Sequence, residues 1–333
     1  MSRLFRCGGA WINGPAVLYT FAGFAVGVWM LTRPGIPINV LGVLLTAHTL
    51  VWSAYLLHDC AHHAVFAAPT ANDRLGGLLS CLNGACLASY ARLKKKHLRH
   101  HADRLDVVTF DYRAVLKDAP AWVRHLVLVL EWAYVPAVEL LMHGFVIAMP
   151  FQCGTRGERL RIMLLMVVRI AMFATLALIS IKALLLYAVA YLIFLHVLRF
   201  MDAFQHTYEI FVSASAIPAP PDPRRTRRYE YENTYSNLVS VRWPWLNLLV
   251  LNFPYHNAHH TQTGAPWYRL PALHRALYGD RDPQVIPSRT LLANYHRHRV
   301  ARILACDYGA VEADGARASG FVGAVGVSFL TAV

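Results

Sequence analysis

The stretch PINVLGVLLTAHTLVWSAYLLHDCAHH, residues 37–63, joins a long apolar segment directly to a cluster of histidines. Residues 37–57 contain no charged side chain, and a helix needs about 20 mainly apolar residues to cross the hydrocarbon layer of a membrane. The histidines begin where the apolar run stops. We therefore expect a transmembrane helix that carries imidazoles at one edge of the membrane.

Three further segments have the same apolar character. Residues 15–31 precede the first segment across a short turn, and residues 162–181 and 183–201 form a second pair that turns near Lys182. Only 15% of the residues are charged and 56% are hydrophobic, whereas about 25% are charged in a soluble domain. These features predict an all-α integral membrane protein with four transmembrane helices in two hairpins. Because no linker or compositional break is found, we expect residues 1–333 to form a single domain.

Positive charge is distributed unevenly along the chain. The regions 91–104, 156–161 and 218–228 are rich in Arg and Lys, whereas the two opposite turns carry only Arg33 and Lys182. Basic loops of membrane proteins face the cytoplasm, so both termini and all large loops are expected on that side. We interpret the formal charge of +13 as serving attraction to membrane lipids with anionic headgroups, and not as a sign of nucleic-acid binding.

Two further apolar segments, 75–90 and 122–149, are expected not to cross the membrane. The first is short and rich in small residues, and charged residues and a histidine interrupt the second. If 122–149 crossed alone, the basic regions 91–104 and 156–161 would lie on opposite faces. Both segments are therefore interpreted as interfacial or re-entrant helices that cap the cytoplasmic side.

Three histidine clusters have related spacing: HDCAHH at 58–63, HLRHH at 97–101 and HNAHH at 256–260. Residues three and four apart share one helical face, so each HxxHH cluster directs three imidazoles to one side. His58 and His62 have the same relation in the first cluster. Imidazole binds iron, zinc and copper, and one tetrahedral zinc needs only four ligands. The clusters therefore predict a site for two metals on the cytoplasmic side.

Four acidic residues lie close to these clusters. Asp202 and His206 in DAFQH, 202–206, are one helical turn apart at the end of the last apolar segment. A carboxylate at the end of a membrane span is costly unless it is paired or ligates a metal, so both residues are metal-ligand candidates. Asp59, Asp103 and Asp106 are interpreted either as solvated charges or as acceptors for imidazole N–H groups.

The chain resembles the membrane fatty acid desaturase family, which includes acyl desaturases, lipid hydroxylases and carotenoid ketolases. The resemblance covers about residues 37–275 and rests on the three clusters, in this order, around two hairpins. DAFQH is similar to an additional ligand element of part of the family. The segment PWYRLP, 266–271, is similar to the residues after the third cluster in bacterial members and carotenoid ketolases.

The resemblance implies a bacterial inner-membrane oxidoreductase with two non-haem iron ions and a hydrophobic substrate channel. The metal ligands would be His58, His62 or His63, His97, His100, His101, Asp202, His206, His256, His259 and His260. The leading reaction is dioxygen-dependent desaturation of a lipid-like substrate, an acyl chain or an isoprenoid. Because the chain has no GxGxxG segment after a strand and no fused haem module, we expect a separate electron donor such as a ferredoxin.

Several alternatives remain open from the sequence. The same centre could serve a lipid or carotenoid hydroxylase or ketolase, which PWYRLP supports. A metal transporter or sensor would place its ligands near the middle of the membrane, whereas these clusters lie at one face. In the first cluster, helical spacing selects His62 and the spacing of acyl-CoA desaturases selects His63.

Overall fold

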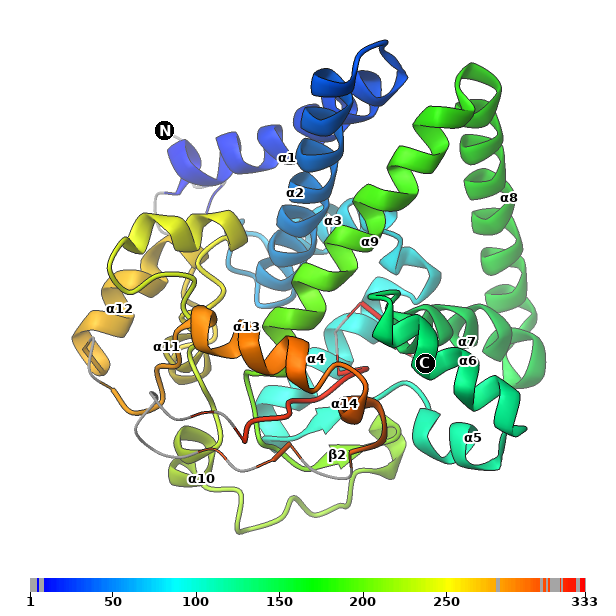
Figure 1. Cartoon of the computed structure of the whole chain (residues 1–333). Coiled ribbons are helices and arrows are strands. Elements are labelled where there is room, and N and C mark those ends of the chain that lie inside the picture. Colours follow the sequence, from blue (N-terminus) through cyan, green and yellow to red (C-terminus); the bar gives the residue numbers. More distant parts are fainter. Residues whose placement is uncertain are drawn as a thin grey trace. The chain divides into compact units, whose positions relative to one another are not determined.

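The computed structural model describes residues 5, 9–279, 282–305, 308, 309, 311, 318, 320–327 and 330–332. The protein is mostly helical (Figure 1). The longer helices are α1 (Ala10–Thr32), α2 (Ile36–Ala61), α3 (Pro69–Asn83), α4 (Tyr90–Asp103), α6 (Ala121–Trp132), α7 (Ala137–Cys153), α8 (Arg156–Ile179), α9 (Ile181–Ala203) and α13 (Ser288–Arg297). The shorter elements are η2 (Ala85–Leu87), β1 (Asp106–Val107), α5 (Tyr112–Asp118), β2 (Ile210–Phe211), η3 (Ala214–Ala216), α10 (Arg227–Glu232), η4 (Pro244–Val250), α11 (His256–Thr261), η5 (Trp267–Arg269), α12 (Leu270–Leu277) and α14 (Ala301–Leu304).

The chain divides into two compact units. The first unit comprises Met1–Tyr90 and His143–Val197, and the second comprises Ala91–Met142 and Leu198–Val333. The single domain expected over 1–333 stays a prediction.

Four helices, α1, α2, α8 and α9, are long and apolar enough to span a membrane. Each contains most of one apolar segment predicted from the sequence, so the all-α membrane fold is confirmed and the chain is a membrane protein. The bounds of α8 differ from the predicted ones, because this helix begins at Arg156 and ends at Ile179 instead of covering 162–181. Its start is fixed by a capping box in which the Thr155 hydroxyl and the Glu158 carboxylate satisfy each other's backbone N–H groups.

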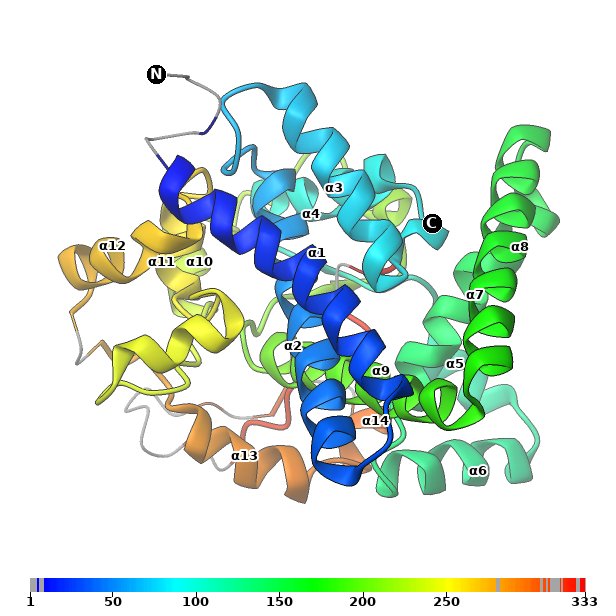
Figure 2. The same cartoon turned by 90° about the horizontal axis from the view of Figure 1, so that it is seen from above.

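The α1–α2 hairpin is packed closely (Figures 1 and 2). A Cβ atom at Gly27 would lie 2.6 Å from Oγ1 of Thr46, and one at Gly42 would lie 3.1 Å from the carbonyl oxygen of Gly27. The absence of side chains at these positions lets the two backbones approach. Across the same pair of helices, the Tyr19 hydroxyl lies 2.5 Å from Nδ1 of His48, so His48 bonds to a neighbouring helix.

The turns of the two hairpins are joined to each other within the first unit. Nζ of Lys182 donates to the carbonyl oxygen of Arg33 at 2.5 Å and to Oδ1 of Asn39 at 2.8 Å. Asn39 in turn donates to carbonyl groups at the end of α1. The single cationic residue of each turn is therefore part of one polar network that satisfies exposed helix ends.

The apolar segment 122–149 forms two helices, α6 and α7, and not one. The break contains Tyr134, with φ +60°, and Pro136, which has no backbone N–H. The Glu131 carboxylate accepts the N–H of Val138 at 3.0 Å and Nη1 of Arg199 at 2.5 Å. Glu139 lies 3.3 Å from Nε of Arg199. The acidic residues that interrupt this segment are therefore the buried partners of an arginine near the end of α9.

The second unit is completed by short irregular elements. β1 and β2 form a parallel pair in which Asp106 faces Ile210 and Val107 faces Phe211. Near the C-terminus, the carbonyl oxygen of Thr331 accepts Nζ of the buried Lys96 at 2.9 Å, and its hydroxyl bonds to Thr109. These contacts fix α4, which carries the second histidine cluster, and the chain just after β1.

Candidate metal centre

Seven histidines of the second unit come together from three separate elements. His97, His100 and His101 lie on α4, His206 follows the end of α9, and His256, His259 and His260 lie on α11. The spacing of three and four residues places each cluster on one face of its helix, as predicted. Most of these imidazoles are buried, because α4, α11 and the chain after α9 converge.

The four-histidine group consists of His100, His206, His256 and His260. One ring nitrogen of each lies within 4.8 Å of those of the others. Nε2 of His206 lies 2.8 Å from Nε2 of His256. Such convergence of imidazole nitrogens from distant parts of the chain is the arrangement that transition metals require.

The three-histidine group consists of His97, His101 and His259. Nε2 of His101 lies 3.1 Å from Nε2 of His97 and 3.1 Å from Nε2 of His259. The two groups adjoin, since the rings of His101 and His260 have centroids 4.2 Å apart. The second unit therefore offers two neighbouring sets of metal-binding nitrogens.

Three of the outer nitrogens of the four-histidine group have hydrogen-bond partners. Nδ1 of His100 lies 2.7 Å from the carbonyl oxygen of Leu105 and 3.1 Å from Asp106. Nδ1 of His260 lies 3.2 Å from Glu230, and Nδ1 of His206 lies 3.4 Å from the Thr234 hydroxyl. A partner on Nδ1 fixes the tautomer and leaves Nε2 for a metal.

Burial keeps His206 and His260 neutral. It lowers the pKa of His206 to about 3, with further lowering by His100, and it lowers the pKa of His260 well below its usual range. Burial alone would raise the pKa of Asp106, but hydrogen bonds from His100 and Tyr308 lower it below its usual value. Neutral imidazoles next to an ionised carboxylate are the protonation states that bind a cation.

The side chains fit a bound transition metal. Nε2 of His260 is buried, and among the described residues it has no hydrogen-bond partner. A buried ring nitrogen in this state carries a desolvation cost, which coordination would remove. The donor set is imidazole with nearby carboxylate, which suits iron as well as zinc or copper.

A small cavity of about 50 Å³ lies beside the four-histidine group, and Asp202, Lys96, His206 and His256 are among its lining residues. This is enough space for one or two waters or a molecule of similar size. Asp202 therefore lies near the predicted ligands, although the four-histidine group does not include it.

The first cluster lies at the end of α2 in the first unit. His58 is buried, and its ring centroid is 4.9 Å from that of His62. His63 follows the helix with φ +54°, and its Nε2 lies 3.7 Å from the carboxylate of Asp73. The rings of His58 and His62 are therefore paired, as helical spacing predicts. His63 lies beyond the helix and faces Asp73 instead.

The carboxylates interpreted either as solvated charges or as acceptors for imidazole N–H groups have different partners. Asp106 contacts His100, and Asp59 lies 3.4 Å from Nδ1 of His58, whereas Asp103 is paired with Arg99 one helical turn away. Glu230 contacts His260 but was not predicted. Its only sequence signal is its place in an Arg-rich segment, which gives no indication of a metal site 30 residues along the chain.

The arginines of the basic segment after α9 are paired with carboxylates. Their partners are Asp222 for Arg224, Glu209 for Arg225, Glu230 for Arg227 and Glu232 for Arg228. Arg225 is also buried. The four cations therefore present less free positive charge than their number suggests.

A comparison with protein families gives a match. The model of a family described as fatty acid desaturase matches residues 34–291, which include all three histidine clusters. No curated protein matches the chain.

Proposed function

The chain belongs to the fatty acid desaturase family, and from this premise we propose that it inserts a double bond into a lipid-like chain with dioxygen and external electrons. The protein would thus be a membrane-bound oxidoreductase. The observation that carries the proposal is the convergence of seven histidines in two adjoining groups. Family membership supplies the lipid substrate and the use of oxygen as expectations.

We propose that the four-histidine group holds one iron ion and the three-histidine group contributes to a second. His58 and His62 are assigned to the same centre because of the family's three-cluster pattern and their own close pairing. His62 is preferred over His63 for this reason, and Asp202 is retained as a candidate beside the metals. When bound, two irons supply the electrons that activate dioxygen for attack on an unactivated C–H bond.

The side chains have three roles in this proposal. The Nδ1 partners of His100, His206 and His260 are Asp106, Thr234 and Glu230. They would hold the Nε2 atoms of these three imidazoles in place for the metals, so that little reorganisation would be needed on binding. Burial of His256 and His260 excludes water from the reacting atoms. Dioxygen would enter the small cavity lined by His206 and Asp202.

The experiment that tests the proposal combines metal analysis with mass spectrometry of host lipids. We expect about two irons per chain and lipids that have lost two hydrogens in cells with the active protein. His260→Ala should remove metal and activity, whereas His125→Ala, on the exposed surface of α6, should remove neither. Iron-free protein that still changes the lipids would overturn the proposal.

A second candidate is a lipid or carotenoid hydroxylase or ketolase on the same centre. The segment PWYRLP, 266–271, favours it because of its similarity to carotenoid ketolases. The same mass spectra distinguish the two, since hydroxylation adds one oxygen and desaturation removes two hydrogens. Zinc alone, with no oxygen consumption under reduction, would instead support a metal transporter or sensor.

We further propose a bacterial inner membrane as the location, with both termini and the metal centre in the cytoplasm. The support is the excess of Arg and Lys in the long loops over the two hairpin turns. Reporter fusions test this. A periplasmic phosphatase fused after residue 34 should be active, and one fused after residue 105 should be inactive.

The electron donor is proposed to be a separate one-electron protein such as a ferredoxin. Purified protein should consume oxygen only when a reduced donor is added. Oxygen consumption with NADPH alone would show that the chain does not need such a donor.

A further inference from the structure

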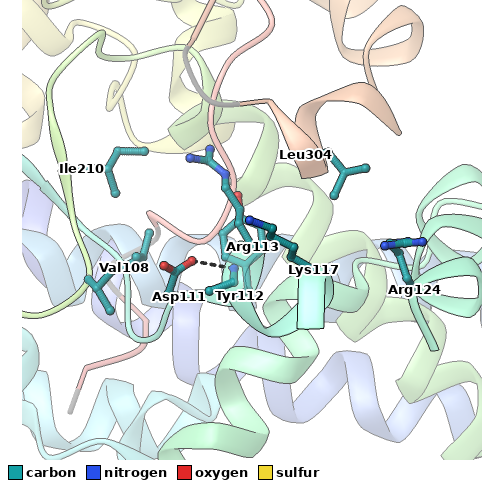
Figure 3. A pocket seen from close by; sticks show the side chains of 10 residues that line it. Val108, Asp111, Tyr112, Arg113, Lys117, Arg124, Ile210 and Leu304 are labelled. Atoms are coloured by element: carbon teal, nitrogen blue, oxygen red, sulfur yellow. Dashed lines mark hydrogen bonds between the residues drawn. The ribbon is translucent and has the colours of Figure 1, made fainter. Parts of the chain in front are cut away.

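One cavity of the second unit lies away from the histidines. Its volume is about 590 Å³, and it is bounded by α5, the beginning of α6, β2 and its following residue, and α14 (Figure 3). Three cations, Arg113, Lys117 and Arg124, line it together with the apolar side chains of Val108, Ile210, Val212 and Leu304. We name it the α5–α6 cavity.

The positive charge of the α5–α6 cavity is not balanced by carboxylates of the described residues. Asp111 is the single acidic lining residue among them, and its Oδ1 accepts the backbone N–H of Ala114 at 2.9 Å (Figure 3). No ion pair to a carboxylate is found for Arg113, Lys117 or Arg124 within the described parts of the chain. Nε of Arg113 is buried and, there too, has no hydrogen-bond partner. The cavity therefore has a net positive charge and an unused donor.

A second observation concerns the helix that supplies Arg124. On α6, Trp122, Leu126, Val129 and Trp132 are all exposed, with exposed fractions of 70%, 49%, 46% and 61%. Their spacing of four, three and three residues makes one continuous apolar face. An exposed apolar face with tryptophan at both ends is typical of a helix that lies in the membrane interface.

We propose that the α5–α6 cavity binds the headgroup of an anionic phospholipid. Its phosphate would contact Arg113, Lys117 and Arg124, since guanidinium groups bind phosphate oxygens in pairs. Its glycerol and the first part of its acyl chains would contact Val212 and Leu304. With α6 in the interface, the cavity stands at the depth where lipid phosphates lie.

The charge of the cavity also selects among lipids. A zwitterionic headgroup has the same phosphate, but its ammonium group would be placed among three cations. Phosphatidylglycerol has no cationic group, so it avoids this repulsion. The proposal concerns a site separate from the metal centre and does not depend on the reaction that the centre catalyses.

The test is native mass spectrometry of detergent-solubilised full-length protein with defined lipids. The wild type should retain phosphatidylglycerol and little phosphatidylcholine. The double variant Lys117→Gln/Arg124→Gln should lose affinity for phosphatidylglycerol by at least about tenfold, since each cation near an anionic lipid contributes roughly a fivefold effect. Lys117→Arg, which keeps the charge, should bind as the wild type does.

The matched control is Arg275→Gln/Arg289→Gln, which removes two exposed cations outside the cavity. It should retain phosphatidylglycerol. Equal loss in the two double variants would overturn the proposal, because general surface charge would then explain binding. Equal retention of phosphatidylcholine and phosphatidylglycerol by the wild type would overturn it too.

A second arm distinguishes a lipid from a soluble anion. Inorganic phosphate at millimolar concentration should leave the thermal unfolding temperature unchanged, while phosphatidylglycerol raises it in the wild type but not in Lys117→Gln/Arg124→Gln. If phosphate alone gives the same rise, and the double variant abolishes it, the cavity is a site for a soluble anion and the lipid proposal fails.

Discussion

The Glu230 carboxylate lies 3.2 Å from Nδ1 of His260, and two arginines hold it there. Its other oxygen accepts Nε of Arg104 at 2.8 Å and Nη1 of Arg227 at 2.9 Å. Glu230 lies on α10, a helix of only six residues that begins at the Thr226 cap. A short polar helix far from the third cluster in sequence thus determines the orientation of an imidazole in the metal centre.

Replacing Glu230 should weaken metal binding without removing a ligand. In Glu230→Gln the anionic acceptor for the His260 N–H group is lost, and such outer contacts are worth about 10–100-fold in metal affinity. We expect iron to be released to a chelator about 10–100 times faster. The measurement is the half-life of bound iron in excess chelator.

The control for this variant lies on the same helix. Glu232 pairs with Arg228 on the exposed surface, at 2.7 Å, and surface ion pairs contribute little. Glu232→Gln should therefore release iron as the wild type does. Similar release from both variants would indicate that α10 as a whole, and not the Glu230–His260 contact, is responsible.

Substitutions of the two candidate ligands in the first cluster, His62 and His63, are expected to have different effects on the iron content. If His62 is a ligand, His62→Ala should reduce the iron content by about one ion per chain, because a metal with too few ligands is lost. His63→Ala should keep both ions, since His63 leaves the helix with φ +54° and faces Asp73. Iron analysis of the two purified variants decides the question. Loss of iron in His63→Ala alone would show that His63 is the ligand, as the spacing in acyl-CoA desaturases implies.

The sequence predicted the elements whose signal is local. The apolar segments gave four membrane helices because length and hydropathy alone determine whether a helix can span, and the HxxHH spacing predicted faces that carry three imidazoles. The pairing of His58 with His62 also agreed with helical geometry. These features need no knowledge of distant contacts.

Contacts between distant segments could not be predicted. Arg199 lies within an apolar run, and nothing in its neighbourhood indicates that Glu131 and Glu139, 60 or more residues earlier, are its partners. Glu230 was missed for the same reason. The pairing of Asp103 with Arg99 illustrates the converse, because an acid near a histidine cluster can have a closer partner on its own helix.

Close packing of α1 on α2 predicts opposite effects for two glycines of the same helix. In Gly27→Ala the new Cβ would lie 3.0 Å from the backbone nitrogen of Thr46, and relief requires the helices to separate. We expect destabilisation of about 1–3 kcal/mol, measured as a lower thermal unfolding temperature in detergent.

Gly14 provides the matched substitution. A Cβ there meets nothing within 4 Å, and alanine is favoured over glycine in a helix by about 1 kcal/mol. Gly14→Ala should therefore be neutral or slightly stabilising. Equal destabilisation by the two substitutions would show that the α1–α2 approach is not the cause.

The buried ion-pair network of Arg199 predicts a stability that depends on pH once the arginine is removed. Arg199 and Glu131 are only 5% and 3% exposed, so Arg199→Met leaves two carboxylates buried without their counter-charge, at a cost of about 3–5 kcal/mol. Burial already raises the pKa of Glu131 above its usual range, against the lowering effect of Arg199, and loss of the guanidinium should raise it further.

The sign of this pH dependence is set by proton binding. In the variant, the folded protein binds a proton at Glu131 that an unfolded glutamate, with a pKa of about 4.3, releases. Stability must then fall as the pH rises above about 4.3.

We expect Arg199→Met to lose more stability relative to the wild type at pH 8 than at pH 5, in denaturant unfolding of the detergent-solubilised protein. The triple variant Arg199→Met/Glu131→Gln/Glu139→Gln has no buried charge at this network, so it should recover most of the lost stability and show no such dependence. If Arg199→Met loses the same amount of stability at both pH values, lost packing of Arg199, and not unpaired buried charge, causes the destabilisation.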